Sequence, residues 1–79
     1  MNNGFVNEVE FDFGPFFELL RQKGIGMKDL VAEDTISAAV LHRMMRNENI
    51  TVATLACLMK RLGVKDVGKI VKLFIAHRA

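Results

Sequence analysis

The chain has 79 residues and a single cysteine, and 51% of its residues are hydrophobic. This composition predicts one folded domain without disulfides and excludes a disordered tail. The longest apolar stretch is about half the ~20 residues that a membrane helix needs, so we expect no membrane partner. The lone cysteine fits a reducing cytoplasm. The net charge of +2 is uneven, because residues 1–20 carry four acids without Lys or Arg and the remainder therefore carries +6. An acidic arm on a basic body is familiar in nucleic-acid binders, but many ordinary domains carry as many extra cations on a solvated face, so the charge alone does not select that class.

Residues 5–13 alternate between apolar and acidic side chains, which is typical of a β-strand. The apolar set is Phe5, Val9, Phe11 and Phe13, and the acidic set is Glu8, Glu10 and Asp12. No later segment alternates in the same way, so the strand is expected to lack a partner within the chain. Two interpretations stay equally open: two chains pair antiparallel through this arm, or the arm is extended and its phenylalanines pack against the helices. The predicted organisation is an acidic arm over 1–13 and a helical domain over 14–79.

Five helices are expected after the arm, which makes the fold class all-α. Gly14-Pro15 starts the first helix, because proline loses no hydrogen bond at the first helical position, and Lys23-Gly24 ends it. The other predicted helices cover 27–33, 37–46, 52–62 and 66–77.

The starts of the second, third and fourth helices are indicated by a pattern that occurs three times. Each time an isoleucine precedes a small or capping residue, and a leucine follows five positions after the isoleucine, as in a hydrophobic staple. The three sets are Ile25/Gly26/Leu30, Ile36/Ser37/Leu41 and Ile50/Thr51/Leu55.

Residues 27–46 place two short helices around the turn Asp34-Thr35-Ile36, as a helix-turn-helix requires. From Phe16 to Phe74 the chain resembles the Cro/C1-type (lambda-repressor-like) helix-turn-helix family of bacterial and phage regulators. The ordered succession of three segments carries this resemblance: FFELLRQKGIGMKDL, TISAAVLHRMMRNENIT and TLACLMKRLGVKDVGKIV.

The resemblance implies a compact five-helix domain whose third helix enters the major groove of duplex DNA. The buried positions that it implies are Leu30, Val31, Ile36, Leu41 and Met44. The groove-facing positions are Ser37, Ala38, Ala39, His42 and Arg43. The implied phosphate contacts are Lys28, Arg46, Asn47 and Asn49.

Several residues depart from the family pattern. The family often has glutamine where Met27 stands, a polar cap at Gly26 and glycine at Thr35. At Ala38 and Ala39 only packing against a thymine methyl is available, so base discrimination would fall on His42 and Arg43.

Other positions lead to expectations of their own. Cys57 is predicted to be a small core or near-core residue. The Met44-Met45 pair is predicted to be core plus rim. His77 is predicted to be exposed near a helix end.

The apolar set of helix 66–77 is too wide for one helix face, so Leu73 or Ile75 is expected to meet a second chain or the phenylalanines of the arm. This favours a homodimer.

No acid pair, Cys/His dyad, glycine-rich phosphate loop or metal-ligand spacing is present in the sequence, so we expect neither an enzyme, a cofactor, a metal nor a small-molecule substrate. The leading hypothesis is a sequence-specific transcriptional regulator, in the first place a repressor that binds duplex DNA as a dimer. The alternative is a helix-turn-helix scaffold that acts as a protein-interaction module with weak or lost DNA binding, which Met27, Ala38 and Ala39 favour.

Overall fold

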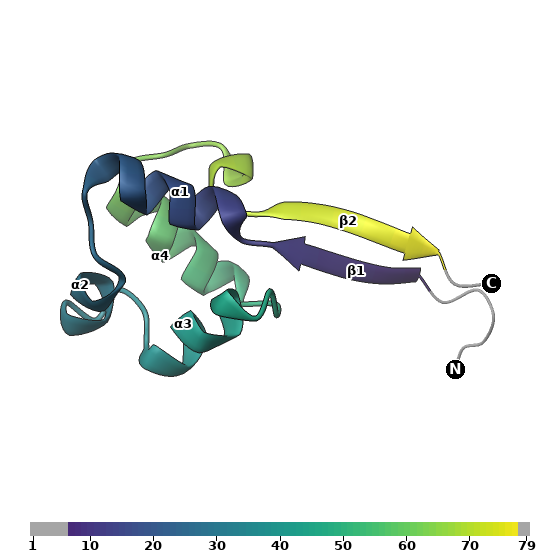
Figure 1. Ribbon diagram of the computed structural model, residues 1–79, viewed down its shortest axis with the longest axis horizontal. Coiled ribbons are helices and arrows are strands. Elements are labelled where there is room, and N and C mark those ends of the chain that lie inside the picture. Colours follow the sequence, from purple (N-terminus) through teal and green to yellow (C-terminus); the bar gives the residue numbers. More distant parts are fainter. Residues whose placement is uncertain (1–6, 78–79) are drawn as a thin grey trace.

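The computed structural model describes residues 7–77 of the chain, and the side chains of residues 9–75. Four α-helices form a small body from which a two-stranded antiparallel ribbon projects (Figure 1). The described part measures 43 × 22 × 18 Å. Its elements are β1 (Asn7–Asp12), α1 (Gly14–Lys23), α2 (Met27–Ala32), α3 (Ala38–Met45), α4 (Val52–Leu62), the 3₁₀ turn η1 (Val67–Lys69) and β2 (Lys72–His77).

The helix starts lie where the local sequence predicts them. Gly26, Ser37 and Thr51 are the N-cap residues of α2, α3 and α4. The Ser37 hydroxyl oxygen accepts a hydrogen bond from the Val40 amide at 3.1 Å, and the Thr51 hydroxyl does the same for the Thr54 amide at 3.1 Å. Each bond satisfies a backbone donor that the first turn of a helix leaves unpaired.

The ends of α1 and α4 also follow from the sequence. Gly24 and Gly63 follow the last residues of these helices with φ of 68° and 71°. This left-handed conformation is one that glycine adopts without a Cβ penalty, and it lets the chain turn away from the helix.

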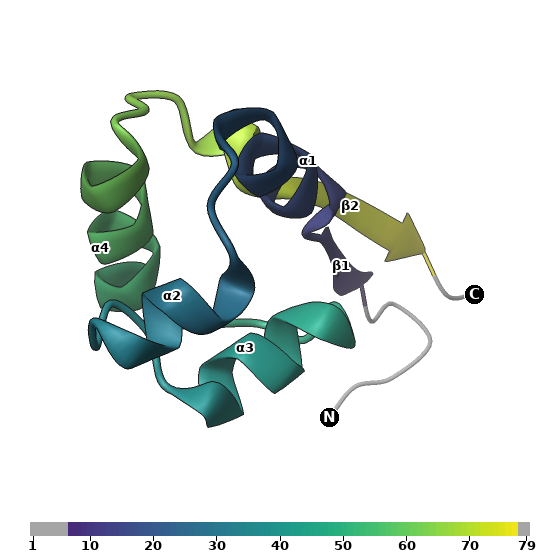
Figure 2. The ribbon, with the colours of Figure 1, turned by 60° about the vertical axis from the view of Figure 1, so that its left-hand side comes forward.

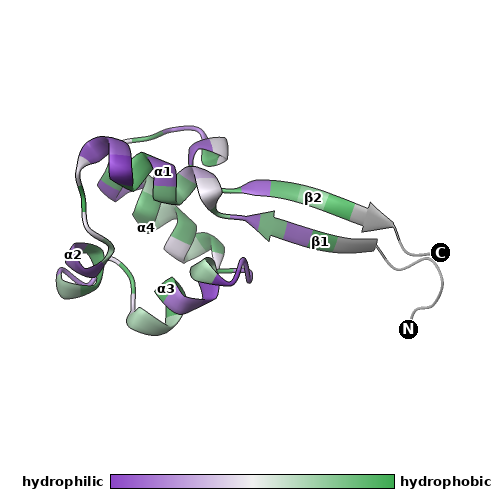
Figure 3. Cartoon of the chain, viewed as in Figure 1, coloured by the Kyte–Doolittle hydropathy of each residue, from purple (hydrophilic) through white to green (hydrophobic). Residues whose placement is uncertain are grey.

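The core lies between the helices, where apolar residues of α1, α2, α3 and α4 meet (Figure 3). Of the positions that the family resemblance implied to be buried, Leu30, Ile36 and Met44 are buried, whereas Val31 and Leu41 are half-buried. Met45 is exposed, so the prediction of a core and a rim methionine is confirmed. The buried residues are Phe13, Phe16, Leu20, Leu30, Ile36, Met44, Leu58, Leu62, Ile70 and Val71.

The predicted helix over 66–77 is wrong. Asp66 accepts a hydrogen bond from the Gly68 amide at 2.9 Å and caps a single 3₁₀ turn, after which Lys72–His77 forms strand β2. An apolar run such as IVKLFI fits a buried helix or a strand equally well by period alone. The glycine at position 68 and the β-branched residues disfavour the helix. Over residues 7–77 the fold is therefore mostly helical, with four α-helices and a small sheet, and it is not all-α.

Strand β1 is confirmed, but its pairing differs from the expectation. It pairs antiparallel with β2 of the same chain, with Asp12 opposite Lys72 and Asn7 opposite His77. The expectation that this strand lacks a partner within the chain is therefore wrong, because sequence alternation did not reveal β2; the use of the arm in pairing two chains stays a prediction. The alternative interpretation is correct for two phenylalanines: Phe13 is buried and Phe11 half-buried, with their rings stacked 6.3 Å apart. Phe5 lies outside the described residues.

Three further expectations have clear outcomes. Cys57 is exposed, so its predicted core position is wrong. It lies on the solvent side of α4, whereas Leu58 and Leu62 face the core. Leu73 was expected to meet either a second chain or the phenylalanines of the arm, and it lies opposite Phe11 in the ribbon. The helix end expected near His77 does not exist, and the side chain of His77 lies outside the described residues.

The connection between α2 and α3 takes its left-handed residue one position earlier than the family pattern suggests. Asp34 has φ of 63°, a conformation that aspartate tolerates better than most residues. Thr35, where the family has glycine, donates its hydroxyl to Glu33 Oε2 at 2.6 Å. The departure at Thr35 therefore requires no positive φ at that position.

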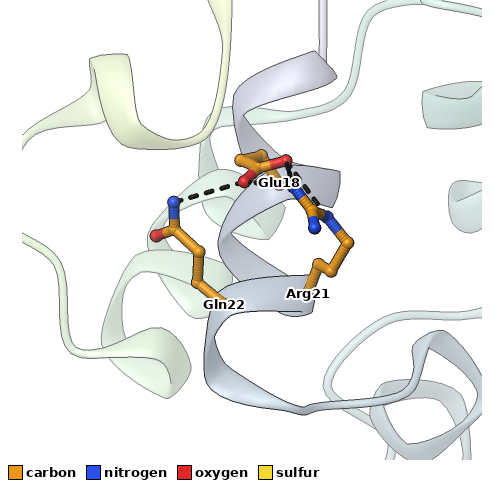
Figure 4. Close-up of polar contacts among 3 residues, drawn as sticks. All are labelled: Glu18, Arg21 and Gln22. Atoms are coloured by element: carbon orange, nitrogen blue, oxygen red, sulfur yellow. Dashed lines mark hydrogen bonds and ion pairs between the residues drawn. The ribbon is translucent and has the colours of Figure 1, made fainter.

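Among the described residues three arginines pair with carboxylates, and two of these pairs, those of Arg21 and Arg61, lie away from α3. On α1, Arg21 Nη2 lies 2.6 Å from both oxygens of Glu18, which also accepts from Gln22 at 3.3 Å (Figure 4). Arg61 of α4 binds Glu33 at the end of α2 through Nε and, at 3.2 Å, through Nη2. Hydrogen bonding to Arg61 lowers the pKa of Glu33 below its ordinary value, and the Thr35 hydroxyl adds to this.

We predict that Glu33→Gln lowers the thermal unfolding temperature slightly at pH 7, and that the difference from wild type shrinks in acid. Because the pKa of Glu33 is lowered in the folded state, its contribution is present above the unfolded pKa, about 4.5, and is lost as the pH falls through the folded value. Thermal unfolding followed by circular dichroism from pH 7 to pH 3 measures this.

A double-mutant cycle with Arg61→Met supplies the control. Arg61→Met should destabilise the wild type more than it destabilises the Glu33→Gln variant. Equal effects in both backgrounds would show that the pair contributes nothing.

Candidate nucleic-acid interface

The outer face of α3 is the main candidate for a binding surface. In both ribbon views α3 lies on the outside of the body, on the side away from α1 (Figures 1 and 2). Met44 anchors the helix in the core, with Val40 and Leu41 half-buried beside it. The helical period then turns Ala38, Ala39, His42, Arg43 and Arg46 away from the core, and all five are exposed.

The start of α3 offers little hydrogen bonding. The Ser37 hydroxyl oxygen already accepts from the Val40 amide, so its remaining capacity is chiefly as a donor. Ala38 and Ala39, the first two residues of the helix, are exposed and carry no polar group. Their small size leaves the helix backbone close to whatever surface it meets.

Arg43 marks the more polar end of this face. It lines a shallow hollow together with Asn49, Ile50 and Thr51, where the end of α3 meets the start of α4. Thr51 is the N-cap of α4, so the positive end of that helix dipole and its first backbone amides lie at the hollow. A guanidinium, a carboxamide and a helix N-terminus together suit a phosphate group. Sequence reasoning did not place Thr51 at this hollow, because the sequence showed it only as a helix cap.

Arg46 and Glu48 form an ion pair at the end of α3. Arg46 Nε lies 3.0 Å from Glu48 Oε2, and both side chains are exposed. The pair spans a turn and is open to solvent, so it is weak and its arginine can exchange Glu48 for another anion. Arg46 therefore stays a candidate phosphate contact, in competition with Glu48.

Asn47 has a structural function that the sequence did not reveal. Its φ is 57°, and its Oδ1 accepts a hydrogen bond from the Phe13 amide at 3.0 Å. This bond joins the end of α3 to the base of the ribbon, 34 positions earlier in the chain. Only the NH₂ group of its side chain remains to meet a phosphate.

Lys28 and Met27 lie in the first turn of α2, and both are exposed. The amide of the N-cap residue Gly26 donates to Asp29 Oδ2 at 3.1 Å. The resemblance implies a phosphate contact at Lys28, which is exposed. Its neighbour Met27 carries a thioether, which cannot donate a hydrogen bond to a phosphate.

Within residues 9–75 no three His, Cys, Asp or Glu side chains gather as a metal ligand set would. No helix in the described part of the chain reaches the length and hydropathy needed to cross a membrane.

Comparison with known proteins gives one informative result. No family model matches the sequence, and no curated protein matches it. Among solved structures, the fold is similar to the crystal structure of the transcriptional regulator VanUg, with a TM-score of 0.79 and 17% sequence identity over 96% of this chain and 100% of that one. At this identity the likeness shows a shared fold, and the Cro/C1-type resemblance stays a prediction.

Asn47 adopts a left-handed backbone conformation and accepts the hydrogen bond from the Phe13 amide, and substitutions can separate these two contributions to stability. We predict that Asn47→Gly, which keeps the positive φ but loses the bond to Phe13, destabilises the protein by about 1 kcal/mol. Asn47→Ala should cost about 1 kcal/mol more, because it adds a Cβ strained by the left-handed backbone. Urea unfolding measures both free energies of unfolding.

Asn47→Asp serves as the matched control, because it retains a side-chain oxygen that can accept from the Phe13 amide. It should lie closer to wild type than the other two. A glycine variant as stable as wild type would show that the hydrogen bond to Phe13 is not needed.

Proposed function

We propose that this chain is a small cytoplasmic transcriptional regulator that binds duplex DNA through α3 and acts by binding, without catalysis. The observation that carries the proposal is the outer face of α3, which is exposed and bears His42 and Arg43, with Arg46 at the C-cap of the helix in an exposed ion pair with Glu48. The acidic strand β1, which could have covered this face, is paired with β2 instead. The fold shared with the regulator VanUg supports the same function.

On this proposal α3 lies in the major groove, as the second helix of a helix-turn-helix does. The exposed alanines let the backbone approach the bases closely and can contact thymine methyl groups. His42 and Arg43 then supply the polar base contacts, and arginine can bind the O6 and N7 of a guanine at ~1–3 kcal/mol for a good bidentate pair.

Phosphate contacts on this proposal flank the groove contacts. The hollow at Asn49 and Thr51 receives one phosphate beside Arg43, and Arg46 binds another after release from Glu48. Lys28, in the first turn of α2, contacts the backbone on the other side of the groove. These contacts set register and affinity but carry no sequence information.

So few polar groups on α3 leave one copy with low specificity. We therefore propose that two copies bind two half-sites about one helical turn apart and regulate transcription, in the first place as a repressor, by occupying the operator.

A second candidate function is a protein-interaction module built on the same scaffold. It is favoured by Met27, Ala38 and Ala39, none of which can hydrogen bond to DNA through its side chain. Absence of any DNA binding at ~50 mM salt would select this second function.

The test compares two double variants with the same change in net charge. Arg43→Gln/Arg46→Gln removes the two arginines of the proposed interface, whereas Arg21→Gln/Lys23→Gln removes two exposed cations of α1. We predict that the first variant loses tenfold or more in affinity for duplex DNA and that its log K against log[salt] slope falls by about 1–2. Fluorescence anisotropy with labelled random duplex, from 50 to 200 mM salt, measures both quantities.

The α1 variant should bind nearly as the wild type does. Equal losses in the two variants would mean that affinity follows net charge alone, and the proposed position of α3 in the groove would be overturned.

A further inference from the structure

One face of the β1–β2 ribbon is entirely apolar within residues 9–12 and 72–75. Directly opposite residues of an antiparallel pair share a face, so the register places Val9 with Ile75 and Phe11 with Leu73 on one side. Phe11 is half-buried against the core, but Val9, Leu73 and Ile75 are 50%, 59% and 66% exposed. We call these four residues the ribbon face.

The other side of the ribbon has a different character. There Glu10 lies opposite Phe74, and Asp12 lies opposite Lys72. The alternation along β1 thus places the charged side chains on one side of the ribbon and the apolar ones on the other. The ribbon nevertheless projects from the body, and none of the helices in residues 7–77 lies beneath its outer part (Figure 1). Isolated two-stranded ribbons are at best marginally stable in water, so a ribbon of this kind gains from a cover over its apolar side.

We propose that the ribbon face is the surface through which two copies of this chain associate, face to face and antiparallel. Self-association suits the ribbon face because it carries no charge, so two copies bring no like charges together there. Docking through the other side would set Glu10 and Asp12 against their own copies. A second copy also matches the length and shape of the surface that it covers.

The apolar area that the two ribbon faces can bury is small, so the association is expected to be weak. The exposed parts of Val9, Leu73 and Ile75 amount to roughly 300 Å², the size of the largest apolar patch on an ordinary monomer. Two such patches with their surroundings stay near or below the ~1,200 Å² that separates transient from standard interfaces. The dimer is therefore expected to depend on concentration.

This arrangement orients the two copies suitably for duplex DNA. In Figure 1 the β1 edge of the ribbon is on the side of α3, and the β2 edge is on the side of α1. Consider a two-fold axis that lies between the two stacked ribbons, parallel to their planes and perpendicular to their strands. Rotation about this axis brings the two ribbon faces together with antiparallel strands. The β1 edges of both ribbons then point in the same direction. Both α3 helices then lie on the same side of the dimer.

The spacing also agrees. A six-residue ribbon spans about 20 Å, which leaves roughly 20 Å of the 43 Å length for the body. Fully overlapped ribbons therefore separate the centres of the two bodies by roughly 40 Å, close to the ~34–36 Å of one DNA turn. Only this orientation on DNA rests on the proposed function; the association itself is a property of the ribbon.

The test uses the full chain and two variants of β2. Leu73→Thr/Ile75→Thr keeps a residue with high strand propensity at each position but makes the ribbon face polar, and Phe74→Thr makes the matched change on the other side. Sedimentation equilibrium over a wide concentration range should take wild type from 8.9 kDa towards twice that mass. The double variant should need at least tenfold more protein for the same shift, whereas Phe74→Thr should behave as wild type does.

Circular dichroism establishes that each variant is folded. If the double variant does not fold, dilution of the wild type followed by backbone amide NMR gives the same answer, because the amides of 9, 11, 73 and 75 should shift with concentration and those of α2 should not. A wild type that stays monomeric, or a dimer that both variants leave unchanged, overturns the inference. A dimer that binds no DNA leaves it standing and overturns the proposed function alone, and a monomer that binds DNA does the reverse.

Discussion

The structure depends on the closure of the chain at the base of the ribbon. Phe13 and Ile70 are fully buried, and the Phe16 amide donates to the Ile70 carbonyl oxygen at 3.1 Å. At the same place the Phe13 amide donates to Asn47. The start of α1, the end of α3 and the start of β2 are thus joined by two hydrogen bonds within an apolar cluster, where an unpaired backbone group would be costly. The register of the ribbon and the position of α3 both follow from this junction.

Much of the helical body could be predicted from sequence because its signals are local. Ser37 and Thr51 bind amides three residues ahead, and Gly24 and Gly63 end helices by their own backbone freedom. The last segment could not be predicted in the same way. Its hydrogen-bonding partner is about 60 positions away, and a run of apolar residues carries no period that separates a strand from a helix. Of the apolar residues there, Ile70 and Val71 are buried and Leu73 lies opposite Phe11, whereas Leu73 and Ile75 stay largely exposed, so the expected cover over them stays a prediction.

In the candidate site, too, some features could be predicted from the sequence and others could not. The family resemblance implied which positions of α3 face outward, and Ala38, Ala39, His42 and Arg43 are exposed, with Met44 and Ile36 buried. The bonds that occupy Asn47 and Arg46 could not be read from the sequence, because the first joins distant segments and the second depends on the path of the chain after α3. The hollow beside Arg43 likewise arises from the meeting of two helices.

The ribbon unites the first and the last described elements, and this has a consequence for synthesis. Pairing of Asp12 with Lys72 closes a loop that spans most of the chain. The entropy of such closure must be lost before the contacts form, which makes non-local pairing a slow step of folding. During translation β1 leaves the ribosome first and must wait for β2, while the helices between them can already form. The nascent protein thus carries Phe11 without its cross-strand neighbour Leu73 until β2 has been synthesised.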